Sequence, residues 1–468
     1  MKKKLFSVFA IIVVMAIAIT CLVACNPYKW DSIGGGDANA PVQSNGGYIV
    51  RQGNYVYYIN GYVGADADSN WGNATKQGIA RAEIDENGNI DNSTTKLLVP
   101  KSIYNTSKNG GIAIFGEWVY YATPNVDKDK NGTPSTTDTD FMRTKIDGSV
   151  TQKLGTIGTR SAEYIFTSTR VLYFTDNTIS YIDFSGMNTT KNIDNAKGAT
   201  TGTIAQNVSN VVWKYESDDI FFVQNAEGEE SYKNYNKLMT CKKDGSDLQT
   251  LATIDTFLGE GEEAIATPLK VFKFNLLAMY VESDGSATLY YVKSHTLDST
   301  TVTDGLYCAK ASDIKGEKLL NKAGSTTLFP LGFEDGALAY NSDSVYCWYN
   351  GSSQSPTQVT TSSQTVWAVD AENGIAYFTA SSSAKALFKI SYKTVDNAVA
   401  VFEEGIKTDW LKLEFIGDDF YFFATDDENF LHTVNVLTFD KTQEDAKSTY
   451  IGFERDEEED EEKDEDNK

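Results

Sequence analysis

Gly116-Glu117-Trp118-Val119-Tyr120-Tyr121 is the stretch that decides the fold, because a turn residue leads directly into an unbroken aromatic and β-branched run. Runs of this composition, bounded by Gly, Asp, Asn and Ser, are typical of short β-strands. The pattern recurs along the chain, in looser form at some positions. We count eight copies, at residues 53–58, 116–121, 169–174, 218–223, 275–280, 335–340, 373–378 and 418–423. Such recurrence of one small element predicts a repeat architecture.

A second element follows most of these copies. It is a strand that runs into an Asp-Gly or similar turn and then into another short strand. Such turns supply the positive backbone angles that a tight hairpin needs. Examples lie at residues 83–88, 143–149, 182–186 and 240–246, and the strand after the turn often carries a Lys-Leu pair, as at 96–97, 153–154 and 318–319. The two elements together form a unit of about four strands.

These units predict an all-β protein. We expect a β-propeller of eight blades, each of about four antiparallel strands, over residues 47–453. Seven blades is the alternative, because the units around Val171 and Leu338 are short. A string of β-sandwich domains would instead show one core pattern per roughly hundred residues, separated by linkers. No linker interrupts residues 47–440, which favours the propeller.

The repeated motifs also resemble a known family. Gly-x-Trp-Val-Tyr-Tyr at 116–121, Ile-Asp-Gly-Ser at 146–149 and Lys-Leu at 153–154 are similar to bacterial propeller domains that are likened to the YWTD propeller of lipoprotein receptors. The resemblance is strongest over residues 47–157 and continues to about residue 440. The full Tyr-Trp-Thr-Asp tetrapeptide is absent from this chain. The resemblance therefore implies the fold, in a secreted or lipid-anchored protein, and not a receptor role.

The N-terminus has the features of an export signal. Lys2, Lys3 and Lys4 precede an apolar run from Leu5 to Ile19. A basic start followed by a short apolar stretch predicts a signal peptide over residues 1–24, and the run is short for a transmembrane helix.

The end of this segment, Leu22-Val23-Ala24-Cys25, resembles the bacterial lipobox. That resemblance implies cleavage before Cys25, acylation of its thiol, and an extracytoplasmic protein anchored by lipid to the bacterial membrane. A plain secreted form with an ordinary signal peptide is the alternative. Residues 25–46 are rich in Gly, Asn, Asp and Ser, which predicts a flexible tether between lipid and propeller.

Charge restricts the partners. The 468-residue chain has a formal net charge of −24. Residues 454–468 hold eleven acidic and three basic residues, a net of −8, which leaves −16 for the remainder. Such an acidic chain repels phosphate backbones, so nucleic acid is excluded as a partner. The 454–468 segment contains no apolar residue and is expected to be a disordered acidic tail.

One loop matches a calcium-binding pattern. Residues 127–132 read Asp-Lys-Asp-Lys-Asn-Gly, with oxygen-bearing side chains at alternate positions and a glycine at the sixth. This order is that of a calcium loop, although the flanking segments are predicted strands and the twelfth position is Asp rather than Glu. The candidate ligands are Asp127, Asp129, Asn131, Thr133 and Asp138. The alternative is a polar hairpin loop that needs no ion, and no other cofactor is indicated.

The sequence supplies little material for catalysis. His295 and His432 are the two histidines, and each stands alone. Cys241, Cys308 and Cys347 remain after Cys25 and are expected to be buried free thiols, with a Cys308–Cys347 disulfide as the alternative. No catalytic residue is assigned.

We therefore expect a binding or scaffold module for a protein, peptide or glycan at the cell envelope. The alternative is a glycan-active enzyme with paired carboxylates, about 5–9 Å apart, in the central funnel. A third possibility is a purely structural role in an envelope complex.

Overall fold

The computed structural model describes most of residues 32–451. The described residues exclude 60–77, 102, 104–110, 126–136, 226–235, 255–270, 298–299, 322–330, 334–335, 341–344, 351–355, 372, 380–385, 403–412, 417–418, 426–431 and 439–447. The predicted signal peptide, Cys25 and the acidic tail at 454–468 lie outside the described residues.

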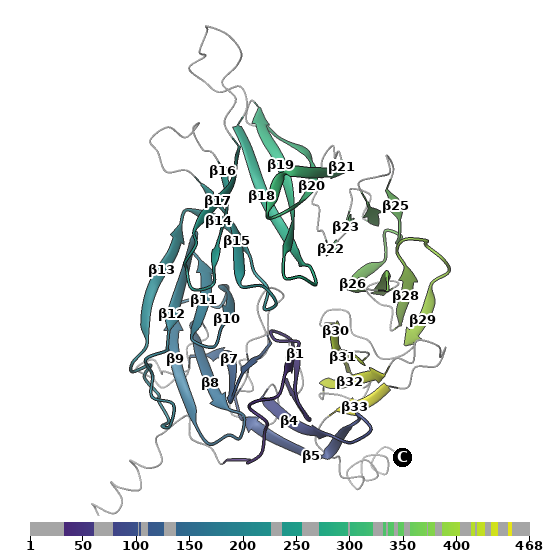
Figure 1. The fold of residues 1–468 in the computed structure, drawn as a ribbon. Helices are drawn as coiled ribbons and strands as arrows, with labels where there is room; N and C mark the ends of the chain where they lie inside the picture. Colours follow the sequence, from purple (N-terminus) through teal and green to yellow (C-terminus); the bar gives the residue numbers. More distant parts are fainter. Residues whose placement is uncertain are drawn as a thin grey trace, which may run out of the picture.

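Eight antiparallel sheets follow one another along the chain and form a ring (Figure 1). Blade 1 consists of β1 (Val42–Gln43), β2 (Ile49–Gln52), β3 (Tyr55–Ile59), β4 (Ile79–Ile84) and β5 (Ile90–Val99). Blade 2 consists of β6 (Ala113–Phe115), β7 (Trp118–Pro124), β8 (Thr139–Lys145) and β9 (Thr151–Ile157). Blade 3 consists of β10 (Glu163–Phe166), β11 (Arg170–Thr175), β12 (Thr178–Asp183) and β13 (Thr200–Gln206). Blade 4 consists of β14 (Val208–Val212), β15 (Asp219–Asn225), β16 (Asn236–Lys242) and β17 (Gln249–Ile254).

The remaining blades repeat the same order. Blade 5 consists of β18 (Val271–Val281), β19 (Ala287–Leu297), β20 (Thr300–Lys310) and β21 (Asp313–Asn321). Blade 6 consists of β22 (Leu331–Phe333), β23 (Gly336–Tyr340), β24 (Tyr346–Tyr349) and β25 (Thr357–Gln358). Blade 7 consists of β26 (Thr365–Asp370), β27 (Ile375–Thr379), β28 (Leu387–Ser391) and β29 (Val399–Phe402). Blade 8 consists of β30 (Leu413–Ile416), β31 (Asp419–Thr425), β32 (His432–Thr438) and β33 (Ser448–Ile451).

This architecture confirms the predicted all-β propeller. Seven sheets have the expected four strands, and the first sheet has five because β1 adds to its inner edge. The described residues include no helix, and accordingly none that is long and apolar enough to cross a membrane.

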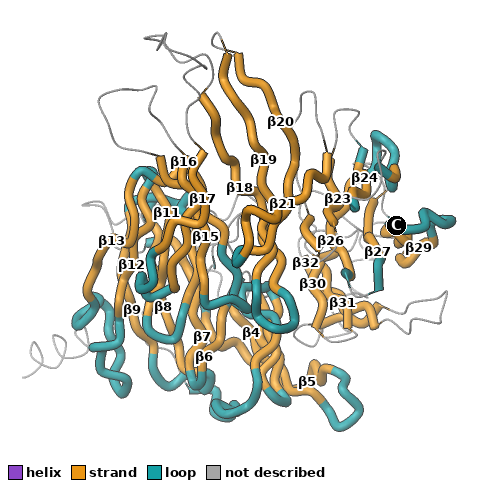
Figure 2. The backbone as a smooth tube through the Cα atoms, turned by 45° about the horizontal axis from the view of Figure 1, so that its top comes forward, coloured by secondary structure: helices purple, strands orange, loops and turns teal. Residues whose placement is uncertain are grey.

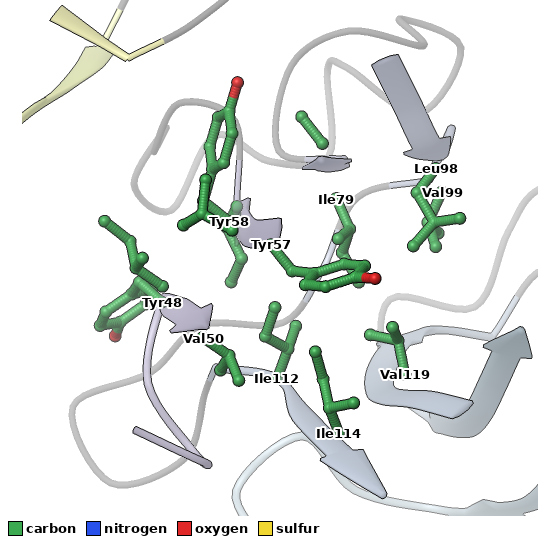
Figure 3. Packing of buried hydrophobic residues seen from close by; sticks show 14 of the residues in the cluster. Tyr48, Val50, Tyr57, Tyr58, Ile79, Leu98, Val99, Ile112, Ile114 and Val119 are labelled. Atoms are coloured by element: carbon green, nitrogen blue, oxygen red, sulfur yellow. The ribbon is translucent and has the colours of Figure 1, made fainter. Parts of the chain in front are cut away.

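The double aromatic residues of the repeat bury both faces of a blade. Successive side chains of a strand point to opposite faces. On β7, Val119 and Tyr121 pack into a cluster shared with blade 1, whereas Tyr120 and Ala122 pack into a cluster shared with blade 3. Figure 3 shows the first of these clusters, in which Tyr57 lies among side chains from both blades. A strand buried on both sides reads as a continuous apolar run, which explains the recurrent sequence.

One of the eight predicted copies is displaced by one strand. Six copies fall on the second strand of a four-stranded blade, and residues 53–58 fall on β3, the equivalent strand of the five-stranded blade 1. Residues 275–280, in contrast, lie on β18, the first strand of blade 5. The equivalent segment is Leu289-Tyr290-Tyr291 on β19. Leu289 and Tyr291 pack toward blade 4 and Tyr290 packs toward blade 6. Two adjacent strands of blade 5 are rich in apolar residues, so the pattern alone selected the wrong one.

The ring has two faces that the strand order distinguishes. We call the lower face the one on which, in each four-stranded blade, the first strand turns into the second and the third turns into the fourth. The opposite face is the upper face. Strands β18, β19 and β20 each have eleven residues, and they extend beyond their neighbours on the upper face (Figure 2).

Residues 32–46, the described part of the expected tether, bind the first two blades. Asn45 exchanges two hydrogen bonds with the backbone of Ile114, at 2.7 and 3.1 Å. The Gly46 N–H donates to the Ile112 carbonyl at 2.7 Å. Arg81 Nη2 donates to the Gly34 carbonyl at 2.6 Å. The Gly and Asn residues of this segment make close contacts with the backbone of the blades. We therefore propose that the tether is limited to residues 25–31.

The three cysteines after Cys25 are free and buried, as predicted. Burial raises the pKa of the Cys241 thiol to about 12 and also raises the pKa of Cys308. Because the thiolate is the reactive form, these side chains behave as core residues.

Candidate binding cavity on the lower face

A cavity of about 390 Å³ opens on the lower face where blades 2, 3 and 4 meet. Its apolar side comes from the ends of two inner strands and from one loop. Phe115 ends β6, Phe166 ends β10, and Tyr215 lies in the loop between β14 and β15. The rings of Phe115 and Tyr215 lie 6.3 Å apart, and the Phe166 N–H donates to the Tyr215 hydroxyl at 3.3 Å. The volume is within the usual range for small-molecule or peptide side-chain pockets.

Arg170 forms part of the polar rim and is held in a fixed position. Its Nε donates to Asp183 Oδ2 at 2.8 Å, and its Nη1 donates to the Asp244 carbonyl of the next blade at 2.5 Å. The guanidinium also lies 4.6 Å from the centre of the Tyr181 ring. Burial alone would raise the pKa of Asp183, but hydrogen bonds from Ser185 and Arg170 outweigh this effect and keep the pKa below its usual value. The Asp183 carboxylate that faces Arg170 is therefore ionised at neutral pH.

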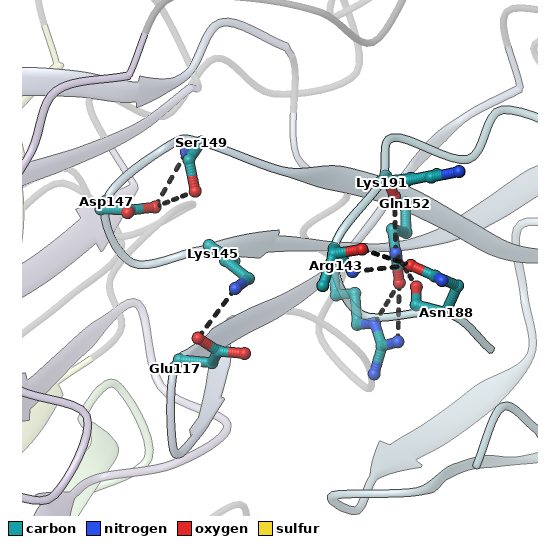
Figure 4. Close-up of polar contacts among 9 residues, drawn as sticks. Glu117, Arg143, Lys145, Asp147, Ser149, Gln152, Asn188 and Lys191 are labelled. Carbon is teal, nitrogen blue, oxygen red and sulfur yellow. Dashed lines mark hydrogen bonds and ion pairs between the residues drawn. The ribbon is translucent and has the colours of Figure 1, made fainter. Parts of the chain in front are cut away.

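Blades 2 and 3 each pair an arginine with an aromatic ring, but the two residues exchange strands between the blades. In blade 2 the arginine is Arg143 on the third strand, stacked 4.2 Å from the Trp118 ring on the second. In blade 3 the arginine is on the second strand and the aromatic ring on the third. Figure 4 shows the Arg143 site, in which Nε and Nη2 donate to Gln152 Oε1 at 2.8 and 2.6 Å. The buried Arg143–Trp118 pair and the half-buried Arg170–Tyr181 pair each hold a guanidinium against an aromatic ring near a blade end.

Lysines from blade 4 complete the rim. Lys242 pairs with Asp219 at 2.9 Å, and this hydrogen bond raises the pKa of Lys242. Lys243 is half-buried, and its ammonium donates to the Tyr215 carbonyl at 3.3 Å. Desolvation lowers the pKa of Lys243, while Asp218 and Glu216 oppose this effect. Lys243 thus places a partly desolvated positive charge beside an aromatic ring, an arrangement that favours an anionic or carbonyl group of a ligand.

Asp244, one of the two acidic residues of the rim, is a poor general acid for glycoside hydrolysis. Asp244 Oδ1 accepts hydrogen bonds from the Ser246 hydroxyl at 2.6 Å and from its backbone N–H at 2.8 Å. These bonds lower the pKa of Asp244. A general acid of a glycosidase needs the opposite shift. Asp218 is the second carboxylate, and its backbone carbonyl accepts from the Lys243 N–H at 2.9 Å.

Among the predicted calcium ligands that the structure describes, Asp138 lies outside this cavity. Asp127, Asp129, Asn131 and Thr133 lie outside the described residues. The last candidate ligand, Asp138, lies at the base of that loop, where its carbonyl accepts from the Asn125 N–H at 3.1 Å. Across the residues that the structure places, no group of three or more His, Cys, Asp or Glu side chains is arranged to hold a metal ion.

His295 has a partner that the sequence did not indicate. Its Nδ1 lies 2.7 Å from Asp304 Oδ1 on the adjacent strand β20. The pair lies in the extended part of blade 5, on the opposite face from the cavity. The side chain of His432 is outside the described part of the chain.

The sequence alone did not identify the residues that line the cavity. Phe115, Phe166 and Tyr215 come from three different blades, and each looked like an ordinary core aromatic. The available signal was the Asp-x-Ser turn that recurs on this face, at Asp183-Phe184-Ser185 and Asp244-Gly245-Ser246. These turns mark the positions where charged residues are held at the blade ends.

The ring of antiparallel four-stranded sheets, with a cavity at one face, defines the chain as a β-propeller protein. No family model matches the sequence, and no curated protein matches it. Among solved structures, the chain is similar to BamB from Moraxella catarrhalis, with 11% identity, 86% of this chain and 99% of that chain covered, and a TM-score of 0.41. It is also similar to a putative 6-phosphogluconolactonase from Bacteroides fragilis, with 13% identity, 85% and 95% covered, and a TM-score of 0.34. A chain of a nidogen/laminin complex matches with 10% identity, 69% and 89% covered, and a TM-score of 0.26.

Proposed function

We propose that this protein is an extracytoplasmic β-propeller, anchored by lipid at Cys25, that binds an extended segment of a protein partner through the lower-face cavity. The cavity is the observation that carries the proposal. It combines an aromatic wall with a rim of both charge signs, and the rim groups are fixed by bonds to the protein itself. A preorganised polar rim lowers the entropy cost of binding and gives specificity.

A peptide fits this arrangement better than the alternative of glycan hydrolysis. An apolar side chain would contact Phe115 and Tyr215, and a backbone carbonyl or acidic side chain would accept from Lys243. The rim carboxylate at Asp244 is fixed in its ionised form, which suits recognition of a donor and not proton delivery.

The binding site is tested with the soluble propeller, residues 32–453, on an array of peptides from extracytoplasmic proteins. We expect a subset of peptides to bind, and we expect Lys243→Gln and Asp218→Asn each to weaken binding about tenfold, the loss of one charged hydrogen bond. Lys191→Gln is the matched control, because this exposed lysine lies outside the cavity. Equal binding by all three variants would remove the cavity from the proposal.

The lipid anchor is tested separately in a bacterium that expresses the full chain. We expect incorporation of labelled palmitate, release from membranes only by detergent, and loss of both in Cys25→Ser. A chain that is exported without label would instead be the plain secreted form.

A further inference from the structure

The chain enters the propeller at the lower face. Ser32 Oγ and the Ile33 N–H both donate to the Asp147 carbonyl, at 2.7 and 2.9 Å. Asp147 lies in the turn between β8 and β9, on the same face as the cavity rim. The Gly34 carbonyl accepts from Arg81, which fixes the next residue of the entering chain. Ser32 is therefore held against blade 2, the blade that contributes Phe115 to the cavity.

The distance from this point to the proposed lipid is short. Six residues lie between Cys25 and Ser32, so seven Cα-to-Cα steps join them. A fully extended chain spans about 3.5 Å per residue, so the tether reaches at most about 25 Å. The strands β19 and β20 have eleven residues each, which corresponds to a length of about 36 Å. The length of these strands, from the lower end of blade 5 to its upper tip, thus exceeds the reach of the tether.

We propose that the lower face is turned toward the membrane, so that the cavity receives a segment of a membrane-bound protein that lies close to the bilayer surface. This inference rests on the proposed lipid anchor at Cys25. It also assigns the long strands of blade 5, with the His295–Asp304 pair, to the side that faces away from the membrane.

Charge favours a protein segment over a lipid headgroup as the occupant. Two of the rim cations, Arg170 and Lys242, are already paired with carboxylates at 2.8 and 2.9 Å. The chain as a whole has a net charge of −24, which opposes close binding of anionic lipids. The wall formed by Phe115 and Tyr215 instead suits an apolar side chain presented by a peptide.

The orientation is tested with two single-cysteine probes on the full lipidated chain. Leu248, 53% exposed, lies in a turn on the lower face, and Val302, 41% exposed, lies near the tip of blade 5 on the upper face. Leu248→Cys and Val302→Cys are each labelled with a fluorophore, while the native cysteines are buried. The proteins are bound to phosphatidylethanolamine–phosphatidylglycerol vesicles that contain a headgroup-spin-labelled lipid.

We expect the Leu248→Cys probe to be quenched several-fold more than the Val302→Cys probe. Equal quenching, or stronger quenching at position 302, would overturn the orientation. Flotation with the vesicles is measured in the same samples. A protein that floats but shows equal quenching contradicts the orientation alone, whereas one that does not float contradicts the lipid anchor.

The occupant is tested by a photo-crosslinking residue at Thr169, an exposed position on the cavity rim. In intact cells we expect the residue at position 169 to crosslink to another protein, at a position next to a transmembrane segment of that protein. These adducts should be lost when the crosslinking protein also carries Lys243→Gln. The Lys191→Gln variant should keep them. Adducts to lipid, adducts only to soluble proteins, or no adduct at all would each overturn the proposed occupant.

Discussion

At the scale of single residues, buried charge is the notable feature of the blade ends. Arg143 is 4% exposed, and its guanidinium is satisfied by the Gln152 side chain and by the Trp118 ring. Gln152 in turn donates to the carbonyls of Asn188 and Lys191 in blade 3, at 2.5 and 2.7 Å. One arginine thus connects the core of blade 2 to the long loop of the next blade.

Arg143→Ala should be strongly destabilising, because it leaves Gln152 Oε1 buried without its donors and removes the stacking on Trp118. We expect a loss of about 3 kcal/mol in the free energy of unfolding, measured by urea denaturation. Lys191→Ala is the control, because its exposed side chain takes no part in the network and only its carbonyl accepts. A loss in Arg143→Ala no larger than that of the control would show that the network contributes nothing.

The Asp-x-Ser turns predict a defined dependence on pH. Asp183 and Asp244 have folded-state pKa values below the usual value, so the unfolded chain binds more protons than the folded chain. Their stabilising contribution is complete above about pH 4 and is lost as the pH falls through the folded pKa values. Ser246→Ala should raise the pKa of Asp244 toward its usual value, as measured by carbon-13 NMR titration. Ser185→Ala should affect Asp183 and leave the Asp244 midpoint unchanged, and the reverse pattern would refute this assignment.

At the scale of elements, the contact between the entering chain and blade 2 depends on glycine. Gly111 has a φ of +83°, and an added Cβ would lie 2.2 Å from the Gly46 carbonyl oxygen. Because the Gly46 carbonyl belongs to the backbone, it cannot move aside as the end of a flexible side chain could. The hydrogen bonds that follow, between Gly46 and Ile112 and between Ile112 and Gly47, require this close approach.

Gly111→Ala should therefore cost more than strain in φ alone. Gly88 is a matched control, with a φ of +88° and open space around an added Cβ. Gly88→Ala should lose about 1–2 kcal/mol from the unfavourable left-handed conformation. We expect Gly111→Ala to lose about 2 kcal/mol more than the control in urea denaturation, because of the clash. Equal losses would mean that this contact relaxes freely.

The loop between β7 and β8 carries the calcium hypothesis, which stays a prediction. The hydrogen bond from the Asn125 N–H to the Asp138 carbonyl joins the two ends of this loop. If Asp127 and Asp129 bind calcium in the folded state only, calcium at about 100 times its Kd stabilises the protein by about 2.7 kcal/mol. Differential scanning calorimetry should then show a higher Tm for the parent and no change for Asp127→Ala/Asp129→Ala. A parent Tm that does not change when calcium is added would mean that the loop between β7 and β8 is a polar hairpin loop that needs no ion.

At the scale of the whole molecule, the sequence was sufficient for the architecture. The aromatic runs predicted the second strands because these strands are buried on both faces and tolerate few polar residues. The same logic failed in blade 5, where β18 is as apolar as β19. The cavity was not predictable, because it depends on how the ends of three blades meet and not on any local pattern. The contacts of residues 32–46 could not be predicted for a similar reason, because their partners are groups that lie far away in the sequence.

Ring closure is the property that no single blade possesses. Each sheet is built from consecutive strands, so among the described strands no sheet joins the two ends of the chain. The first and last blades meet instead through side chains, with Ile416 and Ile451 of blade 8 in the same apolar cluster as Tyr57 and Val50 of blade 1. Propeller blades cannot bury both faces until this last contact forms.

Ile451→Ala should therefore weaken the whole ring, although it changes one residue near the end of the last blade. Ile451 is 2% exposed, and its truncation should cost about 3 kcal/mol through lost burial and a cavity. Val399→Ala is the control, because Val399 is 43% exposed on an outer strand of blade 7 and should change stability by about 0.5 kcal/mol or less. Hydrogen exchange should show faster exchange in blade 1 as well as in blade 8. Faster exchange confined to blade 8 would mean that the ring is held together without this contact.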